Sequence, residues 1–536
     1  MKHLKKTVSI ISLSSVLALA GCGGSSGNGN DKENTDSNVD SNNKTLTFMT
    51  SNSALAPQDP NDKLIFKRLE EKTGIHIDWI SYTDDVFVEK RNLALATGEL
   101  PDAIFNAGLS DYEILNLSNQ GTIIPVDEYI TPEKMPNLSK VLAEAPQYKG
   151  MITAPDGHIY SFPWIEELGS GKESIHSVNN MPWINTKWLD KLGLKMPTTT
   201  EELKQVLIAF KTQDPNGNGK ADEIPISFIN DDGGNEDLSF LLGSFGTGFN
   251  WDETFIDDKG KVNNAVLEPG YKEGMKYLQE LYKAGVVDPE FITQDWNKYI
   301  AKAKDDRFGL YFTWDKANVS GADSPFEPMP ALAGPNGWKN VARTNGMGFD
   351  RARMVITSED KDVESTIKWI DALYDPIQSV QDNWGTYGDE TQQNIFEYDA
   401  AANMLKHLPL NGTSPNELRI KTSVGGPLAI LDSYYGTVST KPDDAAYRLD
   451  IIKNIYVPDM KSDIIYPRVF FSKEESERLT EIEANMMPYI LKKRTEWMQG
   501  ADVDKEWDGF IKEVNRLGMQ DWVKIKQTGY DRTKQQ

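Results

Sequence analysis

The stretch Thr45–Ile80 (TLTFMTSNSALAPQDPNDKLIFKRLEEKTGIHIDWI) decides the fold class. Its first five residues, 45–49, are apolar enough for a short strand. From Leu64 to Gly74 the apolar positions fall on one helical face, and the glycine is a typical helix stop. Residues 75–80 then alternate between apolar and polar side chains, as a half-buried strand does. Strand, helix and strand in this order predict a parallel βαβ unit.

The alternation of strands and helices continues beyond this unit. A second helix is predicted over residues 88–97, ended by Gly98, and a third strand over residues 101–105. About 490 residues follow the first 44, which is too many for one hydrophobic core and enough for two large lobes. We therefore expect an α/β protein of two lobes.

The N-terminus has the pattern of an export signal. Three lysines precede Val8–Ala20, a short apolar run diluted by serines. Such a run is typical of a signal peptide, because a membrane span needs about 20 apolar residues. Leu19-Ala20-Gly21-Cys22 resembles the bacterial lipoprotein box, whose members are cut before the cysteine. We expect residues 1–21 to be removed and Cys22 to carry the lipid; a plain secretory signal is the alternative.

Composition limits the chemistry of the chain. Cys22 is the only cysteine, which excludes a disulfide framework and a thiol-based zinc site. Residues 23–44 contain one apolar side chain, Val39, so residues 22–44 are expected to form a flexible tether.

The net charge of −24 becomes −27 once residues 1–21, with three lysines and no acid, are removed. This acidity argues against nucleic acid or anionic lipid as a binding partner.

The segment Asp214–Glu223 (DPNGNGKADE) is the sharpest motif in the chain. Side-chain oxygens recur at positions 1, 3 and 5, and a glycine at position 6 permits a sharp turn, as in calcium-binding loops. Position 12 is Pro225 instead of the usual bidentate glutamate, so Glu223 at position 10 must serve. A metal-free turn is the alternative, because Asn-Gly-Asn-Gly suits it equally well. The predicted calcium ligands are Asp214, Asn216, Asn218, Lys220 through its carbonyl, Asp222 and Glu223.

A family resemblance rests on four segments in a fixed order. Trp183–Leu194 (WINTKWLDKLGL), followed by Pro197-Thr198-Thr199, resembles extracellular solute-binding proteins of the family-1 type. Preceding it are Gly98–Asp102 (GELPD), Gly121–Val126 (GTIIPV) and Gly157–Pro163 (GHIYSFP), which fit the family in the same order. The resemblance covers essentially the whole mature chain. It is greatest to large Gram-positive lipoproteins grouped with alginate- and fructo-oligosaccharide-binding proteins.

The resemblance implies a periplasmic-binding-protein-like fold, with two discontinuous α/β lobes, a hinge and a ligand cleft between the lobes. We expect residues 45–165 plus about 310–372 in the N-terminal lobe, and residues 166–309 plus about 373–536 in the C-terminal lobe. It also implies a monomer anchored to the outer face of a Gram-positive cell membrane, which delivers oligosaccharides to separate ABC permease subunits. Alginate-type relatives hold calcium in a similar loop, so we expect a structural calcium site outside the cleft.

Aromatic residues next to polar loops are the natural ligands for a sugar. A sugar ring has an apolar C–H face that stacks on an aromatic side chain, and hydroxyls that hydrogen-bond to Asp, Asn, Glu and Arg. For any single tryptophan, packing in the core is the alternative. The candidates are Trp164, Glu167, Trp314, Asp315, Arg343, Asn383, Trp384 and Tyr387, with Asn52 as a further candidate and Trp251, Trp296 and Trp183 in reserve.

Two other functions are weighed against oligosaccharide capture. A glycosidase needs two carboxylates about 5–9 Å apart, and 81 acidic residues could supply them. The sequence has no HExxH zinc motif, P-loop or G-x-G-x-x-G motif, however, and we expect no enzymatic activity. A binding protein for a peptide, or a ligand sensor, is the second alternative.

Overall fold

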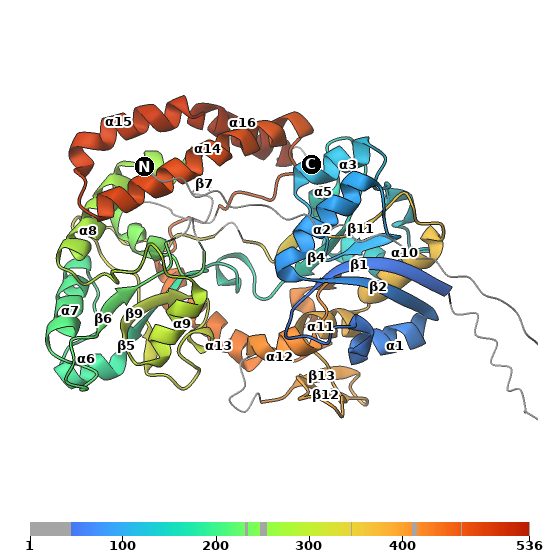
Figure 1. The fold of residues 1–536 in the computed structure, drawn as a ribbon, viewed down its shortest axis with the longest axis horizontal. Helices are drawn as coiled ribbons and strands as arrows, with labels where there is room; N and C mark the ends of the chain where they lie inside the picture. Colours follow the sequence, from blue (N-terminus) through green and yellow to red (C-terminus); the bar gives the residue numbers. More distant parts are fainter. Residues whose placement is uncertain are drawn as a thin grey trace, which may run out of the picture. The chain divides into compact units, whose positions relative to one another are not determined.

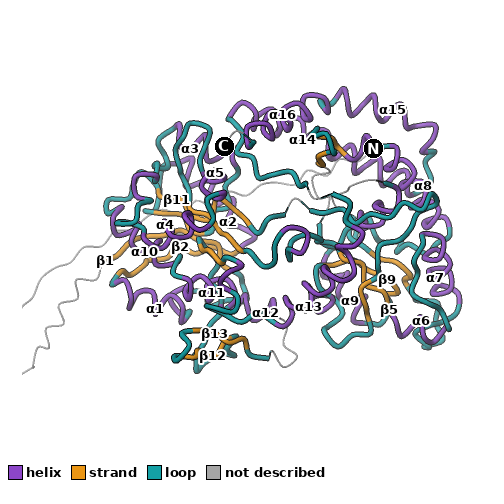
Figure 2. Tube along the Cα trace, turned by 180° about the vertical axis from the view of Figure 1, so that it is seen from behind, coloured by secondary structure: helices purple, strands orange, loops and turns teal. Residues whose placement is uncertain are grey.

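The computed structural model describes residues 44–230, 234–246, 254–344, 346–409, 415–462 and 464–534. These residues form two separate mixed sheets, each covered by helices (Figures 1 and 2). The six-stranded sheet has the order β14-β4-β11-β3-β1-β2, and the four-stranded sheet has the order β10-β5-β9-β6. We call the elements packed on the first sheet the first lobe and those packed on the second sheet the second lobe. Cys22 lies outside the described residues.

The first lobe contains the strands that the N-terminal pattern predicts. β1 runs parallel to β2 in register from the pair Lys44 and Ile75 to the pair Asn52 and Thr83. α1 connects them and ends at Gly74, whose φ of +70° an L side chain would strain. The predicted βαβ unit is confirmed. The bounds are β1 Lys44–Asn52, α1 Leu64–Thr73, β2 Ile75–Thr83, α2 Asp84–Thr97, β3 Ala103–Phe105, α3 Asp111–Asn119, α4 Pro136–Glu144, α5 Gln147–Ile152, β4 Phe162–Glu166, β11 Phe349–Ile356, α10 Val363–Leu373, α11 Pro376–Trp384, α12 Pro415–Thr422 and β14 Leu428–Ile430, with the hairpin β12 Phe396–Asp399 and β13 Met404–His407.

Both faces of the first sheet are buried. Successive residues of a strand point to opposite faces, so Phe48 packs into one core with α1 and α10, while its neighbour Met49 packs into another with α2 and α3. Sheets built from parallel strands typically have helices packed on both faces. β11 runs antiparallel to both β3 and β4 in the middle of this sheet, so the sheet is mixed.

The second lobe is built on β9, a fully buried strand. β9 pairs in parallel with β6 and antiparallel with β5. The Thr199 hydroxyl caps α7 by accepting a hydrogen bond from the Glu202 N–H. The bounds are β5 Met181–Asn185, α6 Thr186–Leu192, α7 Thr200–Thr212, β6 Ile224–Ser227, α8 Pro269–Lys283, α9 Trp296–Lys304, β9 Phe308–Thr313 and β10 Phe326–Pro328, with the hairpin β7 Thr254–Ile256 and β8 Val262–Asn264.

The C-terminal helices belong to the second lobe and also contact the first. α14 (Lys473–Met498), α15 (Val503–Arg516) and α16 (Met519–Thr533) pack on the second lobe's core. α14 contacts both α8 and α3, so it joins the two lobes (Figure 1). α13 (Asp443–Ile451) contributes side chains to both cores. Among the described residues, no helix has the length and apolarity needed to cross a membrane.

The lobe boundaries differ from those predicted. The segment from 310 to the end of β10 was assigned to the N-terminal lobe, but β9 and β10 lie in the second sheet. The segment after 373 was assigned to the C-terminal lobe, but α11, α12 and β14 pack on the first sheet. Periodicity identifies a buried strand such as β9 but carries no information about which sheet it joins. That choice is made by partners distant in the sequence.

Candidate ligand-binding site

A cavity of about 500 Å³ lies between the two lobes. Its wall combines the ends of β4 and α11 and the middle of α12 from the first lobe with the region after β9 and the start of α9 from the second. Ile175 and the pair Asn235 and Glu236 also line it. α13, which spans the two cores, completes it. The residues that line it are Glu166, Ile175, Asn235, Glu236, Trp296, Trp314, Asp315, Ala317, Asn318, Asn383, Trp384, Arg419, Asp444, Ala445 and Arg448.

Four predicted ligand-binding residues meet in this cavity. Trp314 and Asp315 directly follow the apolar strand β9. Asn383 and Trp384 are the last two residues of α11. They were expected in a loop, but the helix continues to Trp384 and its C-cap is Gly385 at a φ of +124°. The strand end of one lobe and the helix end of the other therefore face the same space.

The ring of Trp314 is held by a buried arginine. The guanidinium carbon of Arg448 lies 3.4 Å from the centroid of that ring. Arg448 also donates hydrogen bonds to the backbone carbonyls of Trp314, Val178 and Ile175. Burial lowers the pKa of Arg448, and Asp315 opposes that shift. A cation stacked on one face helps to fix the orientation of the ring at the cavity wall.

Trp384 has a similar arrangement in the first lobe. The guanidinium carbon of Arg419 lies 4.2 Å from the centroid of the Trp384 ring, and Arg419 donates a 3.0 Å hydrogen bond to Asp444. Trp384 is only 5% exposed and packs in the first lobe's core. It therefore supports the fold as well as the cavity wall, whereas Trp314 is partly exposed.

Two carboxylates contribute acceptors to the cavity wall. Burial raises the pKa of Asp315, while the Ala317 N–H, which donates a 2.7 Å hydrogen bond, and Arg448 oppose that rise. Glu166 is 6% exposed, and its Oε2 lies 3.4 Å from Nε2 of His176. Its other oxygen, Oε1, has no hydrogen-bond partner. A buried acceptor without a partner costs about 1–3 kcal/mol, which a ligand hydroxyl could recover.

Trp164 lies behind the cavity wall. Its indole N–H donates a 3.2 Å hydrogen bond to Oδ1 of Asn383. It thereby fixes the orientation of an amide that lines the cavity, without lining the cavity itself.

The structure places Glu167 and Arg343 elsewhere. Glu167 accepts hydrogen bonds from the Tyr148 hydroxyl and the Asp432 N–H, away from the cavity. Its neighbour Glu166 takes the cavity position, because adjacent residues of an extended strand point in opposite directions. Arg343 donates to the Gly171 carbonyl and so connects two segments that pass between the lobes.

Tyr387 and Asn52 also lie outside the cavity. Tyr387 stacks on Tyr398 and underneath the guanidinium of Arg68. Asn52 donates to the Pro57 carbonyl and shapes its own loop. Of the reserve tryptophans, Trp183 is fully buried in the second lobe's core, Trp251 lies outside the described residues and Trp296 lines the cavity.

Sequence reasoning missed the arginines and Glu166. Arg419 and Arg448 lie on helices whose apolar patterns are ordinary, and nothing local marks them as partners of tryptophans. Glu166 was visible beside Trp164, and strand alternation could have selected it over Glu167, because the side chain of Trp164 points to the same face as that of Glu166.

The predicted calcium loop forms a tight turn outside the cavity. The carboxylate oxygens of Asp214 accept hydrogen bonds from the N–H groups of Gly217 and Gly219 at 3.0 and 3.2 Å. The side-chain oxygens of Asn216 and Asn218 each accept from the N–H two residues later. None of these residues lines the ligand cavity.

The loop's acidic side chains face one another. Both Asn216 and Asn218 donate to Oδ1 of Asp222, at 3.2 and 3.0 Å. Burial raises the pKa of Glu223, and the charges of Asp214 and Asp222 add to the rise. Oε1 of Glu223 is buried without a hydrogen-bond partner. Among the described residues, no group of three His, Cys, Asp or Glu side chains is arranged to hold a metal ion. A cation in this loop would therefore need amide and carbonyl oxygens as well, which the loop contains.

Comparisons with known proteins agree with this architecture. Residues 56–380 match the family described as bacterial extracellular solute-binding protein. The chain is 58% identical over 488 residues to the fructooligosaccharide ABC transporter substrate-binding protein FusA of Streptococcus pneumoniae serotype 4 (strain ATCC BAA-334 / TIGR4), covering 91% of this chain and 90% of FusA. The solved structure of S. pneumoniae FusA in complex with kestose superposes with a TM-score of 0.88 over 92% of this chain and 99% of FusA, at 58% identity. A structure of a FusA EF-hand mutant in complex with fructo-nystose matches at the same TM-score, identity and coverage. The chain belongs to the bacterial extracellular solute-binding protein family and has its two-lobed α/β fold.

Proposed function

We propose that this chain is the substrate-binding protein of an ABC importer that captures oligosaccharides between its two lobes. The observation that carries the proposal is the cavity in which Trp314 and Trp384 come from opposite lobes, each with an arginine stacked on it. A cavity of this size is within the usual range of ligand sites, about 300–1,000 Å³. Closure of the lobes about the connecting segments would enclose a sugar between the two rings.

Fructo-oligosaccharides are the ligand class that we favour. The 58% identical relative is named for them, and its solved complex contains kestose. The cavity wall offers aromatic faces and the acceptors Glu166, Asp315 and Asn383 beside them, which suits uncharged rings rich in hydroxyl groups. The related proteins are named as binding proteins, and we propose capture without cleavage for this chain as well.

Kestose and nystose are expected to raise the melting temperature of the purified protein by several degrees at millimolar concentration. A ligand that binds only the folded state stabilises it by RT ln(1 + [L]/Kd), about 2.7 kcal/mol at one hundred times Kd. A thermal-shift panel of fructo-oligosaccharides, malto-oligosaccharides and short peptides checks this. A shift with peptides alone would contradict the proposal. Appearance of shorter sugars after incubation would indicate a glycan-cleaving enzyme instead.

We also propose that the loop Asp214–Glu223 binds a structural calcium ion. The alternating Asp and Asn oxygens, the buried Glu223 oxygen without a partner and the mutual approach of Asp214, Asp222 and Glu223 support it. Rotation of the Asn216 and Asn218 amides would turn their oxygens toward the same point. The FusA structure described as an EF-hand mutant supports a comparable loop in that relative.

Removal of calcium with EDTA is expected to lower the melting temperature of the protein and to change sugar affinity only modestly. The ion stabilises the folded state by binding to it, and the loop lies outside the ligand cavity. Differential scanning calorimetry with and without EDTA checks this, and added calcium should restore the melting temperature. The Asp222→Asn variant removes the charge of one proposed calcium ligand, so its melting temperature should respond less to EDTA. An unchanged melting temperature, together with no calorimetric calcium binding to the stripped protein, would contradict the site.

We further propose that Cys22 is the lipidated first residue of a mature monomer held at the outer face of the cell membrane. The signal pattern before it and the polar segment 23–44 support this anchoring. Permease subunits in the membrane would then receive the sugar. Mass spectrometry of the detergent-extracted protein tests the modification.

A further inference from the structure

Trp296 lines the ligand cavity and is also exposed to solvent, which places it at the cavity's rim. It is the first residue of α9, lines the cavity and is 40% exposed, compared with 5% for Trp384. Because it is exposed, this aromatic side chain contributes little burial free energy to the folded protein without a ligand. Its position at a cavity wall therefore suggests a surface that a ligand covers.

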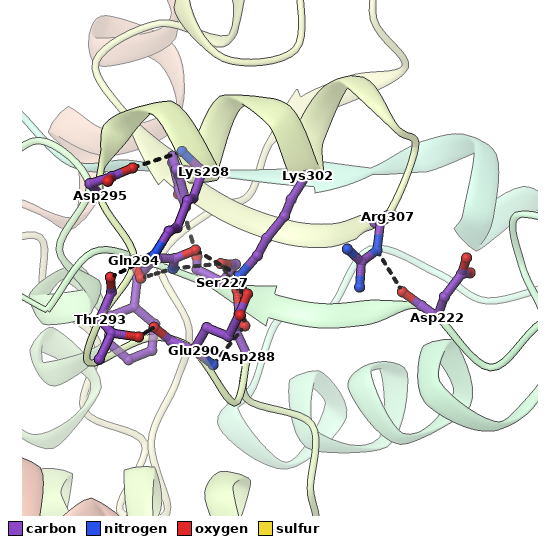
Figure 3. A network of polar contacts seen from close by, with 12 residues as sticks. Asp222, Ser227, Asp288, Glu290, Thr293, Gln294, Asp295, Lys298, Lys302 and Arg307 are labelled. Atoms are coloured by element: carbon purple, nitrogen blue, oxygen red, sulfur yellow. Dashed lines mark hydrogen bonds and ion pairs between the residues drawn. The ribbon is translucent and has the colours of Figure 1, made fainter.

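The start of α9 is fixed by a buried polar network, shown in Figure 3. Gln294, two residues before Trp296, donates to the Ser227 hydroxyl and the Phe228 carbonyl. Lys302, six residues after Trp296 on α9, donates to Oε1 of Gln294 at 3.1 Å and forms a 2.8 Å ion pair with Asp288. Lys302 is 7% exposed and Asp288 is 1% exposed, so this ion pair is shielded from solvent.

The same network joins α9 to the strand that leads to Trp314. The Tyr299 hydroxyl donates to the Phe312 carbonyl at 2.9 Å, and Phe312 lies two residues before Trp314. Asp295 caps α9 by accepting from the Lys298 N–H, next to Trp296. Trp296 and Trp314 are therefore attached to the same rigid part of the second lobe, one at the rim and the other deeper in the wall.

We propose that Trp296 is an outer stacking platform that sets the preference for oligosaccharide length. This inference rests on the proposed function of the cavity. Trp314 and Trp384 bind the inner units of the sugar, and Trp296 stacks on a unit that extends past them toward solvent. A short oligosaccharide fills the inner positions and leaves Trp296 uncovered. A longer one covers it, and the helix that carries Trp296 needs no further ordering when the sugar binds, because the network has already fixed that helix.

Isothermal titration calorimetry with tri-, tetra- and pentasaccharides of the kestose series tests the proposal. The Trp296→Ala variant is expected to lose about tenfold in affinity for the pentasaccharide, the scale of one aromatic contact, and to keep trisaccharide affinity within about twofold. Trp296→Phe should retain most of the preference for length. Trp338→Ala is the matched control, because Trp338 is 45% exposed but does not line the cavity.

The possible outcomes separate this inference from the proposed function. Equal losses for all lengths, or no loss for any length, would overturn the role of Trp296 and leave sugar capture intact. Failure of the unaltered protein to bind any oligosaccharide would overturn the proposed function, and this inference with it. A loss confined to the longer sugars, with Trp338→Ala unchanged, supports the proposal.

Discussion

The Trp314→Ala variant is expected to bind oligosaccharides at least about tenfold more weakly than the unaltered protein, because it removes a complete stacking face. Arg448 covers one face of the Trp314 ring at 3.4 Å and bonds to three backbone carbonyls, so the ring is already oriented before a ligand arrives. Trp314 is partly exposed, but it packs against the first lobe's core and covers the guanidinium of the buried Arg448, so its removal should also lower the melting temperature, by less than the loss of the buried Trp384. Calorimetric titration with kestose, alongside thermal unfolding without sugar, measures both effects.

The Trp384→Ala variant tests the same cavity, but it is expected to change both sugar affinity and stability. Trp384 is 5% exposed and packs in the first lobe's core, so its truncation should also reduce stability by the several kcal/mol typical of a large core deletion, about 3–5 kcal/mol. Trp314→Phe should recover part of the affinity lost in Trp314→Ala. Unchanged sugar affinity in Trp314→Ala would remove this tryptophan from the binding site.

The Lys302→Met variant is expected to lower the free energy of unfolding by about 3–5 kcal/mol, because it leaves a buried charge without its partner. Asp288 is 1% exposed and would retain only the Ser227 hydroxyl at 2.7 Å and the Glu290 N–H at 3.0 Å. Glu290 would also lose its 2.8 Å ion pair with Lys302. Urea unfolding of the sugar-free protein measures the loss.

Two further variants show whether charge burial is the cause. The double variant Asp288→Asn, Lys302→Met removes both charges and should regain part of the stability. Lys204→Met removes a lysine from a surface pair with Glu280, in which Glu280 is 56% exposed, and should cost no more than about 1 kcal/mol. A Lys302→Met variant as stable as Lys204→Met would show that the buried pair contributes little.

Local patterns predicted individual elements well. The helix that Gly74 ends depends on residues within one or two helical turns of each other. The loop Asp214–Glu223 has the same character, since its Asp and Asn side chains bond to N–H groups two to five residues away. Such interactions can be read from sequence because both partners lie in the same short stretch.

The candidate site was predictable only in part. Trp314 could be proposed because it follows an apolar strand, and Asn383 because it begins the glycine-punctuated aromatic stretch Asn383–Gly388. Arg343 and Tyr387 were candidates as well, yet Arg343 hydrogen-bonds to the Gly171 carbonyl and Tyr387 packs against Arg68, both outside the cavity. Residue type shows what a side chain can bind but does not show which way it points or what it meets.

The sequence by itself determined the α/β class and the lone Cys22, and its resemblance to solute-binding proteins indicated the family; the export signal and the calcium loop stay predictions. Only the tertiary structure decided that β9 joins the second sheet and that Arg448 stacks on Trp314, which lies 134 residues before it. It also decided that Trp296 lies at the rim of the cavity while Trp183 is buried in the core. The physical reason is that backbone propensity and periodicity act over a few residues, whereas the cavity is formed by side chains from both lobes that packing brings together.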